Sequence, residues 1–262
     1  MLISDRCAGG AIGGEAAARA TPDGYTLLMA SSSTMSINPH FAAKQSYDPQ
    51  TSFSPVILVG YATNVVAVHP SVPVRTIREL IALAKSKPGE ISFASNGTGT
   101  ISHLTGELFQ QQSGVRMLHV PYKGAAPAVI DVLAGNVSTM ISNPTAVVPH
   151  IRTGKLKALG ILGGQRIDVL KDVPTAVEQG YKEFADVIEW YGMVAPKATP
   201  RSIINQLNAG LTKVLMLPEV QERIRALGMT PSPTTPEEFD KQIRADHALW
   251  GRVVRQAGVK AE

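Results

Sequence analysis

Apolar and polar positions follow one repeating pattern through the first three-quarters of the chain. Short, mainly apolar runs are typical of strands buried in a parallel sheet, and they predict strands over 25–30, 56–59, 64–69, 91–94, 117–122, 137–141, 156–162 and 187–195. Between most of these runs, apolar residues recur every three or four positions, which indicates amphipathic helices. Strands that alternate with helices predict an α/β fold with parallel sheets covered on both faces.

Several helices carry recognisable start signals. Thr76 and Glu79 form a capping box that opens a helix with apolar positions on one face. Asn143 followed by Pro144 has the form of an N-cap and a first helical residue. After residue 195 the pattern is helical only, with helices expected after Pro200, over 218–227 and after Thr235.

Composition narrows the class of protein. The chain has 262 residues, 44% hydrophobic and 18% charged, which is typical of one large or two ordinary globular domains. No apolar run reaches the length of a membrane span. A single cysteine, Cys7, excludes an internal disulfide, and it is expected to be an ordinary small side chain. The net charge of +4 comes from Lys and Arg spread along the chain, which argues against a nucleic-acid partner.

The common catalytic and cofactor motifs are missing. The chain has no G-x-S-x-G, no H-E-x-x-H and no phosphate-binding loop ending in Gly-Lys-Ser or Gly-Lys-Thr. The glycines at 9, 10, 13 and 14 do not match G-x-G-x-x-G, which disfavours a dinucleotide site. Six scattered histidines lack metal-ligand spacing, and only His103 has a special place, just after a Gly-rich loop. We expect no metal and no cofactor.

Three segments that join a strand to a helix are rich in Gly, Ser, Thr and Asn. They span 31–34, 95–103 and 142–145. The start of a helix offers free backbone N–H groups and the positive end of its dipole, which together attract anions. Ligands of open α/β sheets bind where such loops lie, beyond the carboxyl ends of the strands. The pattern favours binding of an anion without chemistry.

The sequence resembles the Bug/TctC family, the extracytoplasmic solute receptors of tripartite tricarboxylate transporters. The matching blocks include PDGYTLLMASSS, FASNGTGTISHLTGELF and HVPYKGAAPAVIDVLAGNV, and the likeness runs in order along nearly the whole chain. It implies a type II periplasmic-binding-protein fold, with two lobes of parallel-rich sheets flanked by helices and two crossing strands near 64–69 and 189–195. Lobe one would comprise 1–66 and 194–262, and lobe two 67–193.

The resemblance also implies a function and a site. The protein would be a periplasmic, monomeric receptor that binds a small organic carboxylate in the interlobe cleft and passes it to permease subunits, without catalysis. Family members hold carboxylates largely through backbone amides, hydroxyls and water. The matching positions, with Lys123, Gly124 and Asn143 at the rim, are Ser31, Ser32, Ser33, Thr34, Ser95, Asn96, Gly97, Thr98, Gly99, Thr100, Ser102, His103, Lys123, Gly124 and Asn143.

Two features depart from the family pattern. Ser142 stands where the family usually has an acidic residue, which changes the expected preference for ligands with an amine. The chain opens without a signal peptide and inside what would be the second strand, so it is expected to lack the N-terminal part of the family pattern. Either the start is misassigned, which we favour, or the chain is a degraded copy that binds its ligand poorly. The strand expected to be missing would be central in the lobe-one sheet.

Two other functions remain open at this point. An α/β enzyme acting on a small carboxylate or phosphate would turn over its substrate. A stand-alone sensor would share every sequence feature of the receptor and would differ by binding a signalling partner in the presence of its ligand.

Overall fold

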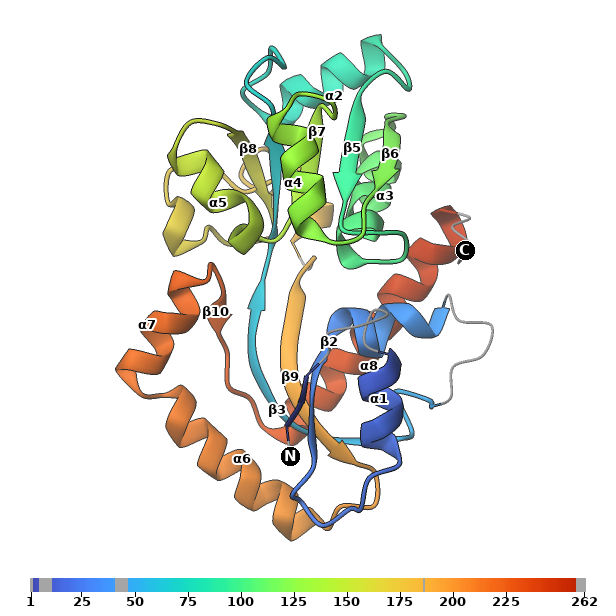
Figure 1. The fold of residues 1–262 in the computed structure, drawn as a ribbon, viewed down its shortest axis with the longest axis vertical. Helices are drawn as coiled ribbons and strands as arrows, with labels where there is room; N and C mark the ends of the chain where they lie inside the picture. Colours follow the sequence, from blue (N-terminus) through green and yellow to red (C-terminus); the bar gives the residue numbers. More distant parts are fainter. Residues whose placement is uncertain (1, 5–10, 41–46, 186, 258–262) are drawn as a thin grey trace. The chain divides into compact units, whose positions relative to one another are not determined.

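A computed structural model describes residues 2–4, 11–40, 47–185 and 187–257. Cys7 and the glycines at 9 and 10 lie outside the described residues. The chain forms two compact units (Figure 1). It passes from the first unit to the second after Tyr61 and returns after Ile188. A short segment further along the chain, Arg225–Met229, also belongs to the second unit, which the sequence did not predict.

The first unit holds a five-stranded sheet in the order β1-β2-β9-β3-β10. β1 lies parallel and directly beside β2, whereas β9 runs antiparallel to β2. The side chains of α6 pack on β3, and Phe239 of α8 packs on Trp190 and Gly192 of β9. Its elements are β1 (Leu2–Ser4), α1 (Ala11–Ala18), β2 (Leu27–Ser31), the helical turns Ser33–Ile37 and Asn38–His40, β3 (Phe53–Ala62), β9 (Glu189–Pro196), α6 (Arg201–Leu215), α7 (Pro218–Ala226), β10 (Thr230–Pro231) and α8 (Pro236–Ala257).

The second unit holds a five-stranded sheet in the order β6-β5-β7-β4-β8. β5 is parallel to β6 and β7, and β4 runs antiparallel to both β7 and β8. Four strands therefore share one direction, and β4 alone opposes them. Its elements are β4 (Asn64–Val68), α2 (Ile77–Ser86), β5 (Ser92–Ser95), α3 (Ile101–Ser113), β6 (Leu118–Pro121), α4 (Ala125–Leu133), β7 (Thr139–Ser142), α5 (Pro144–Arg152), β8 (Lys157–Leu162) and the turns Asp168–Leu170 and Lys182–Phe184.

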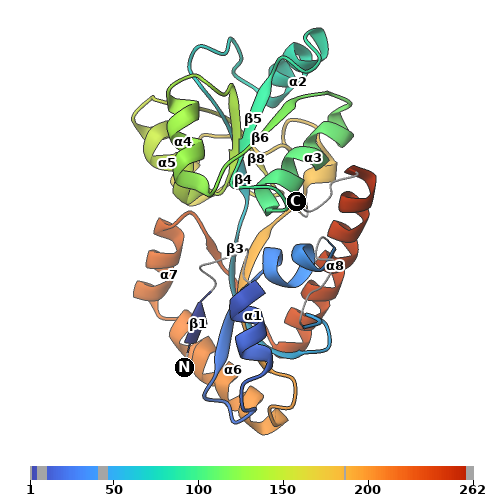
Figure 2. The same cartoon turned by 45° about the vertical axis from the view of Figure 1, so that its right-hand side comes forward.

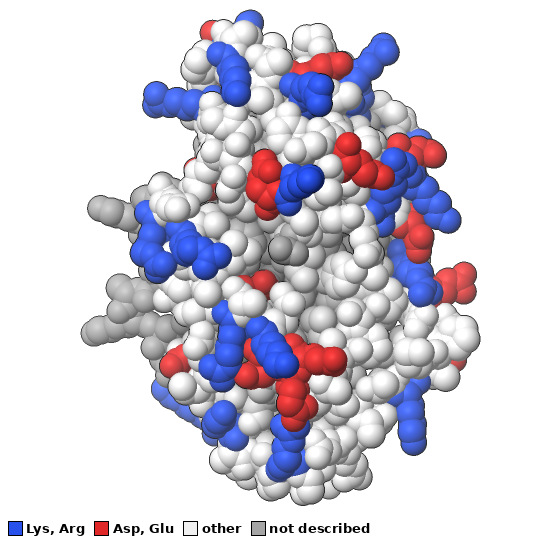
Figure 3. Space-filling model, turned by 180° about the vertical axis from the view of Figure 1, so that it is seen from behind, with Lys and Arg blue, Asp and Glu red and all other residues white. Residues whose placement is uncertain are grey.

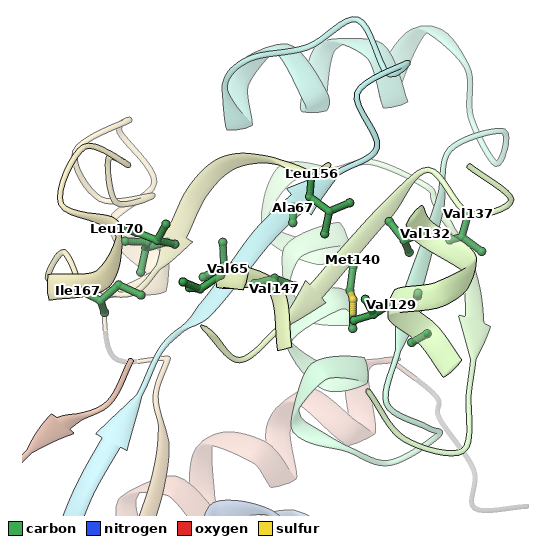
Figure 4. Packing of buried hydrophobic residues seen from close by; sticks show 14 residues of the cluster. Val65, Ala67, Val129, Val132, Val137, Met140, Val147, Leu156, Ile167 and Leu170 are labelled. Carbon is green, nitrogen blue, oxygen red and sulfur yellow. The ribbon is translucent and has the colours of Figure 1, made fainter. Parts of the chain in front are cut away.

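Helices cover both faces of the second sheet. α4 and α5 lie on one face, and α2 and α3 on the other (Figure 2). Between the sheet and α4 and α5 lies a buried cluster that includes Val65, Met140 and Val147 (Figure 4). This packing holds α4 and α5 against the sheet, and so positions the loops that lead into them.

The predicted strands and helices are found, with bounds that shift by a few residues. Thr76 caps α2 by accepting a hydrogen bond from the Glu79 amide at 3.1 Å, as the capping box predicts. Asn143 caps α5, with Pro144 as its first residue. Both sheets are mixed rather than purely parallel. The alternation of strands and helices predicts parallel pairing, but β4 and β9 enter where the chain changes units and run against their neighbours.

Candidate functional site

Three candidate loops of the second unit share one edge of the sheet. β5, β6 and β7 are parallel neighbours, so their carboxyl ends meet at the same edge. Each strand leads into a helix there: β5 into α3, β6 into α4 and β7 into α5. The structure therefore brings together the candidate residues at 95–103, 123–124 and 143.

The β5–α3 loop, residues 96–100, is held by its own hydroxyl groups. Thr100 caps α3, where its Oγ1 accepts from the His103 amide at 3.4 Å, and it also donates to the Gly97 carbonyl at 2.7 Å. Ser102 Oγ accepts from the Asn96 amide at 2.9 Å. Gly97 has a φ of +134°, and a Cβ there would lie 3.0 Å from the carbonyl oxygen of Tyr122, so a side chain would be strained.

Most amides of this loop are already occupied, contrary to our expectation of free donors. The Asn96 amide bonds Ser102, and the Gly97 amide donates to Ser95 Oγ at 3.2 Å. The Gly99 amide donates to His103 Nδ1 at 3.1 Å, and that of Thr100 to the Gly97 carbonyl at 3.2 Å. The described hydrogen bonds leave the Thr98 amide without an acceptor in this loop. Polar side chains close in sequence accept these hydrogen bonds because the short chain segment holds them near the amides.

The β6–α4 loop is tied to the first loop. The Tyr122 amide donates to the Ser95 carbonyl at 3.2 Å, and the Gly124 amide to the Asn96 carbonyl at 3.1 Å. Gly124 is the N-cap of α4 with a φ of +113°, a conformation that favours glycine. The Lys123 side chain is exposed, so its charge is available at this edge. Burial and a 2.6 Å hydrogen bond to Asp131 raise the pKa of Tyr122 to about 12.

Asn143 caps α5 in the third loop, between β7 and α5. Its Oδ1 accepts from the Ala146 amide at 3.3 Å and from the Thr145 hydroxyl at 2.5 Å. The preceding Ser142 is fully buried, and its Oγ has no hydrogen-bond partner among the described residues. A buried hydroxyl without a partner is costly, so a water or a ligand group is its expected partner.

The segment Ser31, Ser32, Ser33 and Thr34 belongs to the first unit and is not the loop that we expected. Ser31 is the last residue of β2, and a helical turn starts at Ser33. Ser32 and Thr34 are fully buried, and Ser31 Oγ lies 3.1 Å from Thr34 Oγ1. Hydrophobic packing of Met35 and Ile37 draws the segment inward, because the polar residues lie between buried apolar ones.

Three polar residues near the second-unit site were not selected from the sequence. His119 on β6 lies 2.7 Å from Ser95 Oγ through its Nε2, and Glu107 Oε1 lies 3.6 Å from His103 Nε2. Asn64, at the start of β4, donates to Thr105 Oγ1 at 3.1 Å, and its Oδ1 has no partner among the described residues. The pairing of β6 with β5 and of β4 with β7 brings His119 and Asn64 here, so strand order was the missing signal for these two. Glu107 follows His103 by four residues on α3, a helical spacing that was visible in the sequence.

No group of three or more His, Cys, Asp or Glu side chains within the described ranges could hold a metal ion. No helix of the described residues has the length and apolarity that a membrane span requires. Basic and acidic side chains are interspersed on the face shown in Figure 3, as the mild net charge predicts.

Comparison with known proteins identifies the family. The model of the tripartite tricarboxylate transporter family receptor (TctC) matches residues 2–259. The chain belongs to this family. Protein BugT of Bordetella pertussis is 39% identical over 99% of this chain and 80% of its own length.

Two solved structures of proteins from Rhodopseudomonas palustris resemble this chain. A protein solved with adipate is 30% identical, with a TM-score of 0.88 over 97% of this chain and 85% of its own. MatC, solved with bound malate, is 29% identical, with a TM-score of 0.81 over 95% of this chain and 85% of its own.

These similarities confirm the family and fold expected from the sequence. The chain has the TctC type of periplasmic-binding-protein fold, with α/β units and mixed sheets flanked by helices. Members of the family are solute-binding receptors and not enzymes, so the enzyme alternative is set aside.

Proposed function

We propose that this TctC-type protein is a periplasmic receptor for a small organic carboxylate, which it delivers to the permease subunits of a tripartite tricarboxylate-type transporter without catalysis. The observation that carries the proposal is the similarity to two proteins solved with adipate and with malate. Both ligands are dicarboxylates of short chain length. The shared edge of polar loops in the second unit supports it, because hydroxyls and amides at helix starts suit carboxylates.

The proposed ligand residues are those expected from the sequence. Lys123 adds an exposed positive charge, and the Thr98 amide adds a donor that has no acceptor within the loop. We further propose that the protein acts as a monomeric receptor with two lobes, for which the sequence suggests residues 1–66 with 194–262 and residues 67–193. The two units divide five residues earlier in each case, after Tyr61 and after Ile188. The proposed set comprises Ser31, Ser32, Ser33, Thr34, Ser95, Asn96, Gly97, Thr98, Gly99, Thr100, Ser102, His103, Lys123, Gly124 and Asn143.

The proposed ligand class is a dicarboxylate or hydroxy acid that lacks an amine. Ser142 is neutral where an acidic residue would offset an ammonium group, and a buried ammonium without a counter-charge is costly. Malate and aspartate make a matched pair for this point, since a hydroxyl in one replaces the ammonium of the other. We expect the purified protein to bind malate at least about tenfold more tightly than aspartate, a difference of about 1.4 kcal/mol.

Calorimetric titration with malate, adipate and aspartate tests the ligand class. Lys123→Ala should weaken binding of the preferred acid by about three- to tenfold, the range of one solvated charge contact. Lys155→Ala is the matched control, because Lys155 is also exposed but precedes β8 at the opposite edge of the sheet. Tighter binding of aspartate, or equal losses in both lysine variants, would contradict the proposed ligand class or site.

Delivery to a permease needs a separate experiment. Cells that carry the cognate permease should take up labelled malate or adipate only when this receptor is present. Ligand-dependent capture of a signalling protein, with no effect on uptake, would contradict the transport role.

A further inference from the structure

Two histidine rings lie beneath the β5–α3 loop and form a stack. The ring centroids of His103 and His119 are 3.8 Å apart, and the planes are tilted by only 6°. His119 in turn stacks on Phe93 of β5, at 4.8 Å. Phe93 is fully buried and His103 is 4% exposed, so the stack is anchored in the core of the second unit.

Each ring holds one part of the loop. His103 Nδ1 accepts the Gly99 amide at 3.1 Å. His119 Nε2 lies 2.7 Å from Ser95 Oγ, which accepts the Gly97 amide at 3.2 Å. An imidazole nitrogen accepts a hydrogen bond only when it carries no proton. The bond to Gly99 therefore requires neutral His103, with its proton on Nε2, which faces Glu107 Oε1 at 3.6 Å.

Because the Gly99 amide donates to His103 Nδ1, it is not available to an anion at this loop. Gly99 follows Thr98, whose amide has no acceptor among the described residues. Two neighbouring amides can both donate to one carboxylate, as happens in concave runs of backbone N–H groups. While His103 is neutral, only the first of these two amides is available.

We propose that His103 and His119 are positioning residues of the carboxylate loop, and that uptake of a proton by His103 releases the Gly99 amide to the bound carboxylate. This inference rests on the proposed function. The imidazolium cannot accept from Gly99, and its positive charge also favours a nearby anion. Carboxylate affinity is therefore higher in the form of the protein whose His103 carries two ring protons.

The surroundings of the stack favour a switch at His103 rather than at His119. Within the part of the chain that the structure describes, Glu107 on α3 is the acidic group that faces the pair, and each histidine faces the other. β5 contributes Phe93 and Ser95, which do not titrate. Burial first, and then the charge of His103, lower the pKa of His119 to about 4. Near neutral pH His119 thus stays neutral and keeps its hydrogen bond with Ser95.

The first test needs no ligand. The amide resonance of Gly99 is followed by NMR between about pH 5 and 8, the range in which histidines change charge. His103→Asn places an oxygen near the position of Nδ1 that can accept from Gly99 but cannot titrate. The control is His69→Asn, because His69 follows β4 at the opposite edge of the sheet and bonds Ser71. Gly99 should titrate in the parent and in His69→Asn, and not in His103→Asn. Titration that persists in His103→Asn would overturn the proposal.

The second test uses malate and adipate in the same three proteins. The parent and His69→Asn should bind the preferred acid at least about threefold more tightly at pH 6 than at pH 8, beyond the change in His103→Asn. The ligand's own titration is the same in all three and cancels. Equal pH dependence in the parent and His103→Asn would overturn the coupling. Failure of both acids to bind at either pH would contradict the proposed ligand class, while the Gly99 titration would still decide the positioning role.

Discussion

Acidification should destabilise this protein through His119. Burial and the neighbouring His103 lower the pKa of the His119 imidazole to about 4, whereas a histidine in an unfolded chain titrates at about 6.5. Between these two values the unfolded chain binds more protons than the folded one. The free energy of unfolding therefore falls as the pH is lowered through this window, and the contribution is intact above it.

The size of the effect follows from the two pKa values. Lowering the pH from about 7 to about 4.5 would remove about 2.4 kcal/mol if the shift were fully expressed. His119 is partly solvent-exposed, so screening reduces this to about 1 kcal/mol. For a chain of this length, about 1 kcal/mol lowers the thermal midpoint by about 2–4 °C.

A glutamine at position 119 isolates this contribution. His119→Gln keeps a hydrogen-bonding group near Ser95 Oγ but cannot take up a proton. Thermal midpoints of the parent and the variant at both pH values give a double difference in which the titrating groups that do not interact with His119 cancel. The parent should lose about 2–4 °C more than the variant on acidification. His69→Gln, the matched control, should behave as the parent does; identical losses in the parent and His119→Gln would refute the reasoning.

Three further predictions concern stability. Burial raises the pKa of the Glu189 carboxyl, so its ionised form is disfavoured in the folded protein and the free energy of unfolding falls as the pH rises. Glu189→Gln still accepts a hydrogen bond from the Tyr191 hydroxyl but cannot ionise. It should raise the thermal midpoint at pH 8 and have little effect near pH 4. Gly114→Ala should lower the free energy of unfolding by about 1 kcal/mol, because the φ of Gly114 is +63°. Gly210→Ala should raise it by about 0.5–1 kcal/mol, because Gly210 lies inside α6 with open space around its Cα. Urea unfolding measures both values. Met140→Ala should cost about 2–5 kcal/mol in the same assay, since Met140 is fully buried in the second-unit core; a loss below about 1 kcal/mol would contradict this packing.

Local signals in the sequence were sufficient for most secondary structure. The capping pair Thr76 and Glu79, and the Asn143-Pro144 start, each specify a helix end through contacts three residues apart. Such contacts need no knowledge of the fold. The order in which strands pair could not be predicted in this way, and β4 and β9 run against their neighbours because the chain changes units there.

The meeting of the three second-unit loops was predictable, but their hydrogen bonds were not. Parallel neighbours place the loops after β5, β6 and β7 on one edge, which the alternation of strands and helices already suggests. Whether a loop amide is free depends on which side chain reaches it. His103 reaches Gly99 from four residues away, and His119 reaches Ser95 only through strand pairing. Ser32 and Thr34 read as a polar loop but are buried, since Met35 and Ile37 beside them pack inward.

The most direct test of the receptor role is a thermal melt of the purified protein with and without malate, adipate and a panel of mono-, di- and tricarboxylates. A ligand at about a hundred times its Kd stabilises the native state by about 2.7 kcal/mol, which corresponds to a rise of about 5–10 °C for a chain of this size. The account predicts such a rise with at least one dicarboxylate, and a smaller one with aspartate. A well-folded protein whose midpoint no carboxylate changes would contradict it.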